Sequence, residues 1–200
     1  MKDLSGSRHR QEIDASADSP PRVDAASLFR AHARFVASFL ARLGAASGEI
    51  EDLVQEVFLV AHRRGGFLPG AARPTTWLAE IALRVHGAHR RKRRRRPEAP
   101  DTERIADTPS SGRTPGQHAE QREALARVQR ALEAIDEPRR AVFILFELAG
   151  ESCDAIAAGL AIPIGTVYSR LHKARKLFRE AYSRLQEDEA PAVTRAKRAV

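Results

Sequence analysis

The stretch from Ser152 to Lys176, SCDAIAAGLAIPIGTVYSRLHKARK, constrains the fold of this chain most. A short amphipathic segment is followed by a tight connection at Ala161–Pro163, and a longer basic segment begins at Ile164. Proline is tolerated at the start of a helix because its missing N–H would have no intrahelical partner there. Two helices joined this closely predict a helix-turn-helix, whose second helix enters the DNA major groove.

The second helix of this motif has two different faces when its residues are spaced at about 100°. Val167, Leu171 and Ala174 share one face and are expected to pack inward. The opposite face carries hydroxyl, imidazole and cationic groups, which suit base edges and phosphates. An ordinary solvated basic helix is the alternative, but the Pro–Ile–Gly–Thr–Val start favours DNA binding. The candidate DNA contacts on and beside this face are Thr166, Ser169, Arg170, His172, Lys173 and Lys176.

The composition limits the partners and the compartment. A formal net charge of +8 over 200 residues indicates a polyanionic partner, either nucleic acid or an anionic membrane surface. There is no apolar run long enough to span a bilayer and no signal-peptide core, so we expect a cytoplasmic protein without membrane insertion. Cys153 is the only cysteine, which excludes an internal disulfide and a multi-cysteine zinc site. Because β-branched runs are short, the expected fold is all-α.

The chain divides into two small helical domains with polar segments around them. Residues 25–96 and 119–186 carry the apolar periodicity of helices. Residues 97–118 are rich in Pro, Ser, Thr and Gly and are expected to form a flexible linker. We expect residues 1–24 to be a disordered tail and residues 187–200 to be a charged tail.

Helix boundaries follow from the same periodicity. Gly44 is a plausible stop for the first helix, and Thr75 or Thr76 a plausible N-cap for the third. The break at Asp136–Pro138 separates two further helices before the motif. The expected helices span residues 25–44, 48–64, 76–96, 119–135 and 139–149, then the two motif helices, the last of which runs to Leu185.

The motif and the residues before it resemble a known family. PIGTVYSRLHKARKLFRE and the preceding IDEPRRAVFILFELAGESCDAIAAGLAI resemble region 4 of the sigma-70 family, in particular the small extracytoplasmic-function sigma factors. The resemblance implies recognition of the minus-thirty-five promoter element. Ala161 stands where the family usually has glycine, and Tyr168 stands where a lysine is common.

A second block carries the resemblance near the N-terminus. EDLVQEVFLVAHR is similar to region 2.2 of a sigma factor, the helix that docks on the clamp helices of core RNA polymerase. The resemblance implies that Asp52, Gln55 and Glu56 form the docking surface. Favourable interaction of acidic residues with the helix dipole is the alternative explanation for Asp52.

The third block, PTTWLAEIALRVHGAHRRKRR, resembles regions 2.3 and 2.4, which open the promoter and recognise its minus-ten element. The basic run that ends it suits phosphate contacts, which add affinity without sequence information. A lone Trp at helical spacing is more often a core residue than a ligand contact, and a core position is the alternative for Trp77. The family often has asparagine near Arg84 and aspartate near Ala88, so minus-ten specificity is not transferred. The candidate DNA contacts of this block are Trp77, Arg84, Arg90, Arg91 and Lys92.

Together these blocks predict a bacterial alternative sigma factor that binds core RNA polymerase and promoter DNA, with an anti-sigma factor as a further candidate partner. A helix-turn-helix regulator that acts without polymerase is the first alternative, and an enzyme acting on nucleic acid is the second. No catalytic motif is present, so we expect neither enzymatic activity nor a cofactor. His86 and His89 lie one helical turn apart, but no third ligand is near in sequence and no metal is expected.

Overall fold

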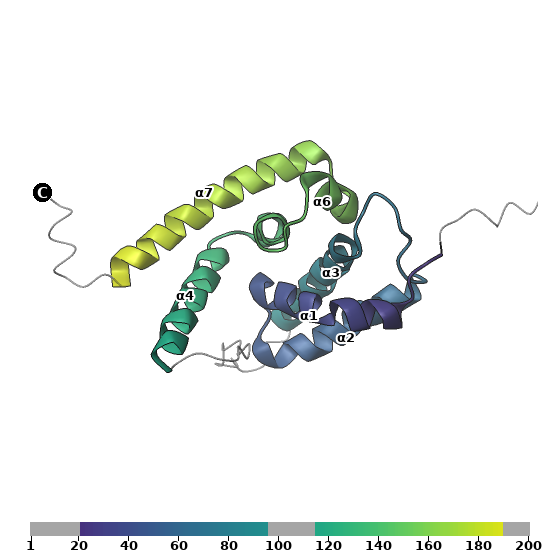
Figure 1. The fold of residues 1–200 in the computed structure, drawn as a ribbon, viewed down its shortest axis with the longest axis horizontal. Helices are drawn as coiled ribbons and strands as arrows, with labels where there is room; N and C mark the ends of the chain where they lie inside the picture. The colour runs from purple at the N-terminus through teal and green to yellow at the C-terminus, as the bar shows by residue number, and fades with distance from the viewer. Residues whose placement is uncertain (1–20, 96–114, 190–200) are drawn as a thin grey trace, which may run out of the picture.

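The computed structural model describes residues 21–95 and 115–189, and these residues form an all-α fold of two helical units. We call residues 21–95 the first unit and residues 115–189 the second unit (Figure 1). Most of the expected N-terminal tail, linker and C-terminal tail lies outside the described residues. Where the expected N-terminal tail is described, Val23 pairs with Phe67 and Asp24 caps the first helix, and residues 115–118 of the expected linker are helical.

The first unit is a bundle of three helices that pack on one another. Asp24 caps the first of them by accepting a hydrogen bond of 2.9 Å from the backbone N–H of Ser27. Gly44 ends that helix with a φ of 98°, the left-handed conformation that glycine adopts without strain. The expected stop at Gly44 is therefore confirmed. The elements are α1 (Ala25–Leu43), the 3-10 turn η1 (Ser47–Glu49), α2 (Ile50–Arg63) and α3 (Pro74–Arg95).

A short backbone bridge closes the first unit. Val23 and Phe67 exchange two hydrogen bonds of 2.8 and 2.9 Å in an isolated antiparallel bridge. Gly66 has a φ of 82°, and a Cβ at this position would lie 3.2 Å from the carbonyl carbon of Val23 and closer still to its oxygen. Glycine is therefore required at position 66 by both the conformation and the close approach.

The start of α3 differs from the sequence-based expectation. Pro74 is the first helical residue, a position at which proline is common because the first N–H of a helix is unpaired in any case. Thr76 lies inside the first turn, where its hydroxyl accepts from the N–H of Arg73 (3.1 Å) and donates to the carbonyl of Arg73 (2.9 Å). The expectation of a threonine N-cap was wrong.

The second unit contains the predicted helix-turn-helix. Asp136 caps a new helix by accepting from the N–H of Arg139 at 3.2 Å, which confirms the break and restart expected there. That helix does not continue regularly to Ala149, because residues 144–148 adopt π-helical geometry. The last helix packs against the three other α-helices. The elements are α4 (Pro115–Glu133), α5 (Glu137–Phe143), the π segment η2 (Ile144–Leu148), α6 (Cys153–Leu160) and α7 (Ile164–Glu189).

The two units pack against each other. The main contact joins α3 to α6, and α1 also contacts α4 and α5; Figure 1 shows α6 beside α3. Buried apolar side chains of both units, such as Leu78 and Ile156, belong to one continuous core. The sequence predicted the helices of each unit but not this packing between them.

Candidate nucleic-acid interface

The turn of the helix-turn-helix is held by local hydrogen bonds. Ser152 caps α6 by accepting from the N–H of Ala155 at 3.2 Å. Ala161 then adopts φ 52° and ψ 48°, the left-handed conformation that costs a non-glycine residue roughly 1–2 kcal/mol. The carbonyl of Pro163 accepts from the N–H groups of Thr166 (2.9 Å) and Val167 (3.2 Å) and so starts α7. These bonds define where α6 and α7 begin, and the two helices pack on each other.

The two faces of α7 lie as the sequence predicted. Val167, Leu171 and Ala174 are buried, with exposed fractions of 0%, 4% and 0%. The opposite face is accessible to solvent from Thr166 to Lys176, which is about three helical turns at about 3.6 residues per turn. This face points away from the helices of the second unit against which α7 packs. Of the candidate DNA contacts, Ser169, His172, Lys173 and Lys176 are exposed, and Thr166 and Arg170 are partly exposed.

One residue that holds α7 in place was missed in the sequence. Nε of Arg175 donates a hydrogen bond of 2.6 Å to Oε1 of Glu147, and its guanidinium lies 5.0 Å from the ring centre of Phe146. An ion pair together with a cation–π contact orients a side chain better than either alone. Arg175 therefore ties α7 to the π segment η2. Arg175 belongs to the basic stretch of the predicted motif, but nothing in the sequence pointed to Glu147 as its partner.

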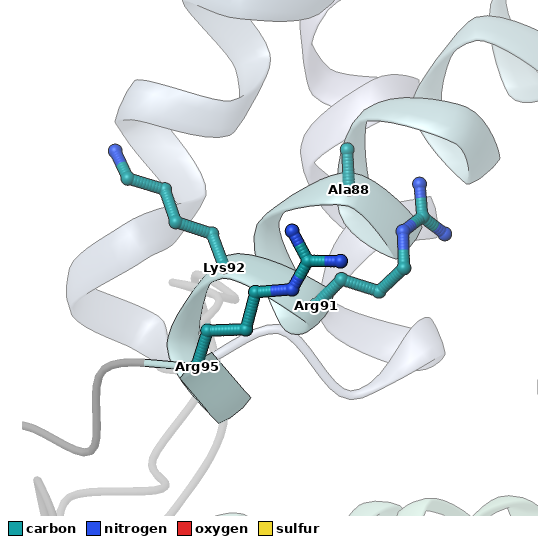
Figure 2. A pocket seen from close by; sticks show the side chains of 4 residues that line it. All are labelled: Ala88, Arg91, Lys92 and Arg95. Carbon is teal, nitrogen blue, oxygen red and sulfur yellow. The ribbon is translucent and has the colours of Figure 1, made fainter.

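The cations of α3 form two groups. Some pair with an acidic side chain, and others have no such partner among the described residues. Arg84 forms an ion pair with Glu80 of its own helix, and Nη1 of Arg90 lies 2.6 Å from Oε2 of Glu137 in α5. Arg91 and Lys92 are exposed, and no ion pair joins them to another described residue. Together with Ala88 and Arg95 they line a shallow hollow at the end of α3. Figure 2 shows Lys92 and Arg91 directed to opposite sides, with Arg95 between them.

Trp77 lies at the other end of α3 and is only partly exposed. Its ring packs at 5.6 Å between centroids against the buried ring of Phe67. The indole therefore packs against the core of the first unit. The sequence was consistent with either a core position or a DNA contact for Trp77. The packing against Phe67 supports the core position.

The two histidines of α3 do not converge on one point. Nδ1 of His86 lies 3.2 Å from Oε1 of Glu137, and Nε2 of His89 lies 3.1 Å from Oε1 of Glu49. Burial alone would raise the pKa of Glu49, but the close contact with His89 and the charges of His89 and Arg93 bring that pKa below its usual value. Within residues 21–95 and 115–189, no three His, Cys, Asp or Glu side chains gather as a metal site requires.

The candidate docking residues share one side of α2. Asp52, Gln55 and Glu56 are all exposed, whereas Leu53 and Val57 on the other side are 1% and 0% exposed. Residues three and four positions apart are neighbours on a helix surface. The three side chains therefore form one acidic and amide face, which is distinct from the basic end of α3 and from the outward face of α7.

Comparison with known proteins identifies the family of both units. Residues 28–96 match the family model of sigma-70 region 2, and residues 125–178 match that of sigma-70 region 4. The sigma-E factor of Escherichia coli K12, an ECF RNA polymerase sigma factor, is 34% identical over 148 residues, which cover 70% of this chain and 77% of the relative. The chain belongs to the ECF family of RNA polymerase sigma factors. SigE of Mycolicibacterium smegmatis, another ECF sigma factor, is 31% identical over 172 residues, covering 84% of this chain and 65% of SigE.

Solved structures share the fold of this sigma factor. RpoE of Bartonella quintana, in complex with the anti-sigma factor NepR, matches with a TM-score of 0.59 and 24% identity, covering 78% of this chain and 94% of RpoE. CnrH, in complex with the cytosolic domain of CnrY, matches with a TM-score of 0.56 and 22% identity, covering 83% of this chain and 89% of CnrH. At these identities the two structures support the fold alone.

Family membership settles the broad function. The protein is an alternative sigma factor for transcription initiation, and its partners are core RNA polymerase and promoter DNA. A helix-turn-helix regulator that acts without polymerase is not favoured, because the first unit matches region 2 of sigma factors. Sigma factors are initiation factors and not enzymes. No helix within the described ranges is long and apolar enough to cross a membrane.

Proposed function

We propose that three surfaces of this sigma factor divide the work of initiation. The acidic face of α2 docks on core polymerase, the outward face of α7 contacts the upstream promoter element, and the basic end of α3 holds phosphates near the minus-ten element. The observation that carries the proposal is the segregation of charge: an exposed acidic and amide face on α2 in a chain of net charge +8.

The face of α2 is unsuited to DNA. Asp52 and Glu56 are exposed, and phosphates would repel both carboxylates. Complementary charge at an interface favours encounter with the right partner and disfavours the wrong one. A positively charged surface on core polymerase therefore suits Asp52, Gln55 and Glu56.

The surfaces on α3 and α7 suit DNA in different ways. Exposed His172 and Lys173 on α7 carry groups that can bond to base edges in the major groove. Arg91 and Lys92 at the end of α3 are exposed cations, which suit phosphates and carry no sequence information by themselves. Residues 25–96 and 119–186 would then be the two promoter-binding domains. Residues 97–118 would be the linker between them.

Three further assignments belong to the same proposal. The two structural neighbours form complexes with NepR, an anti-sigma factor, and with the cytosolic domain of CnrY, which supports an anti-sigma factor as a further partner here. Transcription takes place in the bacterial cytoplasm, which supports a cytoplasmic location. The chain itself would catalyse no reaction and need no cofactor, because polymerase carries the chemistry.

The proposal is tested with core polymerase and charge reversal on α2. Glu56→Lys, alone and with Asp52→Lys, is expected to weaken retention on immobilised core polymerase and to lower promoter-specific transcription. Glu123→Lys on α4, also exposed, is the control for the change in charge. Circular dichroism checks that each variant keeps its helices. Retention of both α2 variants at the level of the control would refute the docking assignment.

A further inference from the structure

The two tyrosines of this chain lie in very different surroundings. Tyr182 is partly buried, and its ring stacks on that of Phe178 at 5.7 Å between centroids. Tyr168 is 58% exposed, more than any other large apolar side chain in the described ranges. Within those ranges no side-chain hydrogen bond or ring contact joins Tyr168 to another residue. The packing of the second unit therefore gives no reason for a tyrosine at position 168.

A second exposed apolar side chain lies next to Tyr168. Ile164 is the first residue of α7, and 37% of its surface is exposed. Because residues four positions apart are neighbours on a helix surface, Ile164 and Tyr168 lie side by side. Together they form a small apolar surface at the N-terminal end of the second motif helix. We call these two side chains the apolar patch.

The helix backbone beside the apolar patch is open to a ligand. Gly165 lies on the outward face of α7, and a Cβ at this position would meet nothing within 4 Å. The packing of the protein therefore does not require glycine at position 165. Since a glycine lets the backbone come close to a bound molecule, the first turn of α7 can approach the base edges of a duplex.

The apolar patch borders the polar groups that the proposed function assigns to DNA. Ser169 follows Tyr168 in the sequence, and His172 and Lys173 follow about one turn later, all three exposed. At about 100° per residue, His172 lies only about 40° from Tyr168 around the helix. Lys173 brings positive charge to the same end of α7, which favours a polyanion over an apolar protein partner. A duplex bound to these groups therefore also covers the apolar patch.

The chemistry of the major groove identifies what the apolar patch can contact. Helix-turn-helix proteins place the N-terminal residues of the second helix on the base edges, and the apolar patch lies at that end of α7. In this groove the base pairs present hydrogen-bond donors, hydrogen-bond acceptors and one apolar group, the C5-methyl of thymine. The face of the Tyr168 ring and the side chain of Ile164 offer no donor or acceptor. Of the groups in the groove, they therefore suit the methyl.

We propose that Ile164 and Tyr168 form a thymine-methyl subsite, which makes the protein prefer an A·T pair at one position of the upstream promoter element. The inference rests on the proposed DNA contact of the outward face of α7, and it adds two uncharged residues to that contact. Burial of one methyl-sized group changes affinity by about fourfold. The subsite therefore selects one base pair, while His172 and Lys173 supply the polar contacts. The hydroxyl of Tyr168 takes no part in it.

The experiment separates the methyl group from the rest of the base pair. Duplexes with a randomised upstream segment are selected on the holoenzyme, and uracil then replaces each selected thymine in turn, which removes only the methyl. At one position we expect uracil to lower the affinity of the wild-type holoenzyme about fourfold. Tyr168→Ala should bind the thymine and uracil duplexes equally, whereas Tyr168→Phe should keep the difference. Leu125→Ala removes an exposed apolar side chain from α4 and is the control that should also keep it.

The possible outcomes separate this inference from the proposed function. Equal affinity of the wild-type holoenzyme for the thymine and uracil duplexes at every position would overturn the subsite, and so would a methyl effect that survives in Tyr168→Ala. An equal loss of affinity for cognate and scrambled duplexes in Tyr168→Ala would also overturn it, and would assign the ring to phosphates or to polymerase. In each of these cases His172→Ala still lowers the preference for the cognate element. If the outward face of α7 does not contact DNA at all, His172→Ala leaves that preference unchanged as well.

Discussion

Arg140 of α5 donates a hydrogen bond of 2.8 Å to the carbonyl oxygen of Leu43, at the end of α1 in the other unit. The same guanidinium donates to the carbonyls of Ile135 (2.7 Å) and Glu133 (3.2 Å) at the end of α4. Burial lowers the pKa of Arg140 from its ordinary value, yet arginine stays charged in proteins. One side chain therefore completes the ends of two helices that belong to different units.

This geometry predicts a penalty for replacing Arg140 with lysine. Lysine keeps the charge but lacks the planar fork that reaches several carbonyls at once. Because hydrogen bonds to charged groups contribute about 1.5–3 kcal/mol, Arg140→Lys is expected to lower the free energy of unfolding in urea by about 2 kcal/mol. Arg139→Lys is the control, since its pair with Asp136 is 42% exposed on both sides and such pairs contribute about 0–1 kcal/mol. Equal losses in the two variants would contradict the role of Arg140.

The left-handed residue in the helix-turn-helix predicts a stabilising substitution. Ala161 has a φ of 52°, which glycine adopts without the steric cost of a Cβ. We expect Ala161→Gly to raise the free energy of unfolding by about 1 kcal/mol. Ala158→Gly, at an exposed helical position of α6, is expected to lower it by about 1 kcal/mol. Thermal unfolding of both variants measures the difference, and a loss of stability in Ala161→Gly would argue against this turn geometry.

Local sequence signals predicted local structure well. The helix-turn-helix, the stop at Gly44 and the break at Asp136–Pro138 each depend on residues within a turn of one another. Family resemblance added the order of the two sigma regions. The inward face of α7 followed from helical spacing alone, because Val167, Leu171 and Ala174 repeat at that period.

Local sequence patterns could not predict the contacts between the two units. Glu137 and His86 are 51 positions apart, and Thr75 and Glu151 are 76 apart. Helical periodicity relates residues within a few turns and cannot detect pairs this far apart in the sequence. The sequence shows that Arg90 is a cation, but nothing in the sequence pointed to its partner Glu137 in the other unit. The π segment η2 was missed for a related reason, since its residues are ordinary helix formers whose geometry is set by packing.

The low pKa of Glu137 predicts how its contribution depends on pH. A carboxyl whose folded pKa lies below its unfolded value stabilises the fold above that unfolded value, ordinarily 4.5 for glutamate, and loses this contribution as the pH falls through the folded pKa. Wild type should therefore exceed Glu137→Gln in free energy of unfolding by about 1 kcal/mol at pH 7. The difference should shrink below about pH 4.5 and vanish in stronger acid. Urea titrations across this range measure it, and a difference that grows on acidification would reverse the assigned sign.

The exposed cations at the end of α3 predict a change in salt dependence. Arg91 and Lys92 are exposed beside the hollow in Figure 2, and each phosphate contact contributes about 0.9 to the slope of log affinity against log salt concentration. Replacing both with alanine is expected to reduce the slope for holoenzyme binding by up to about 1.8, with sequence preference unchanged. Arg30→Ala with Arg34→Ala on α1 removes the same charge from exposed positions and serves as control. An unaltered slope in the α3 variant would assign these cations to solvent.

The exposed face of α7 predicts the opposite pattern, a loss of specificity with little change in salt dependence for His172. His172 and Lys173 lie opposite the buried face of this helix, so their polar atoms are accessible to a DNA duplex that binds there. A good side-chain contact to a base is worth about 1–3 kcal/mol of discrimination. His172→Ala and Lys173→Ala should each lower the preference of the holoenzyme for a cognate over a scrambled upstream element by about 5- to 150-fold. Competition binding with the two duplexes measures this preference. Arg179→Ala is the control, because Arg179 is an exposed cation further along α7 and outside the candidate contacts. If the preference survives in both test variants, another face of α7 contacts the bases.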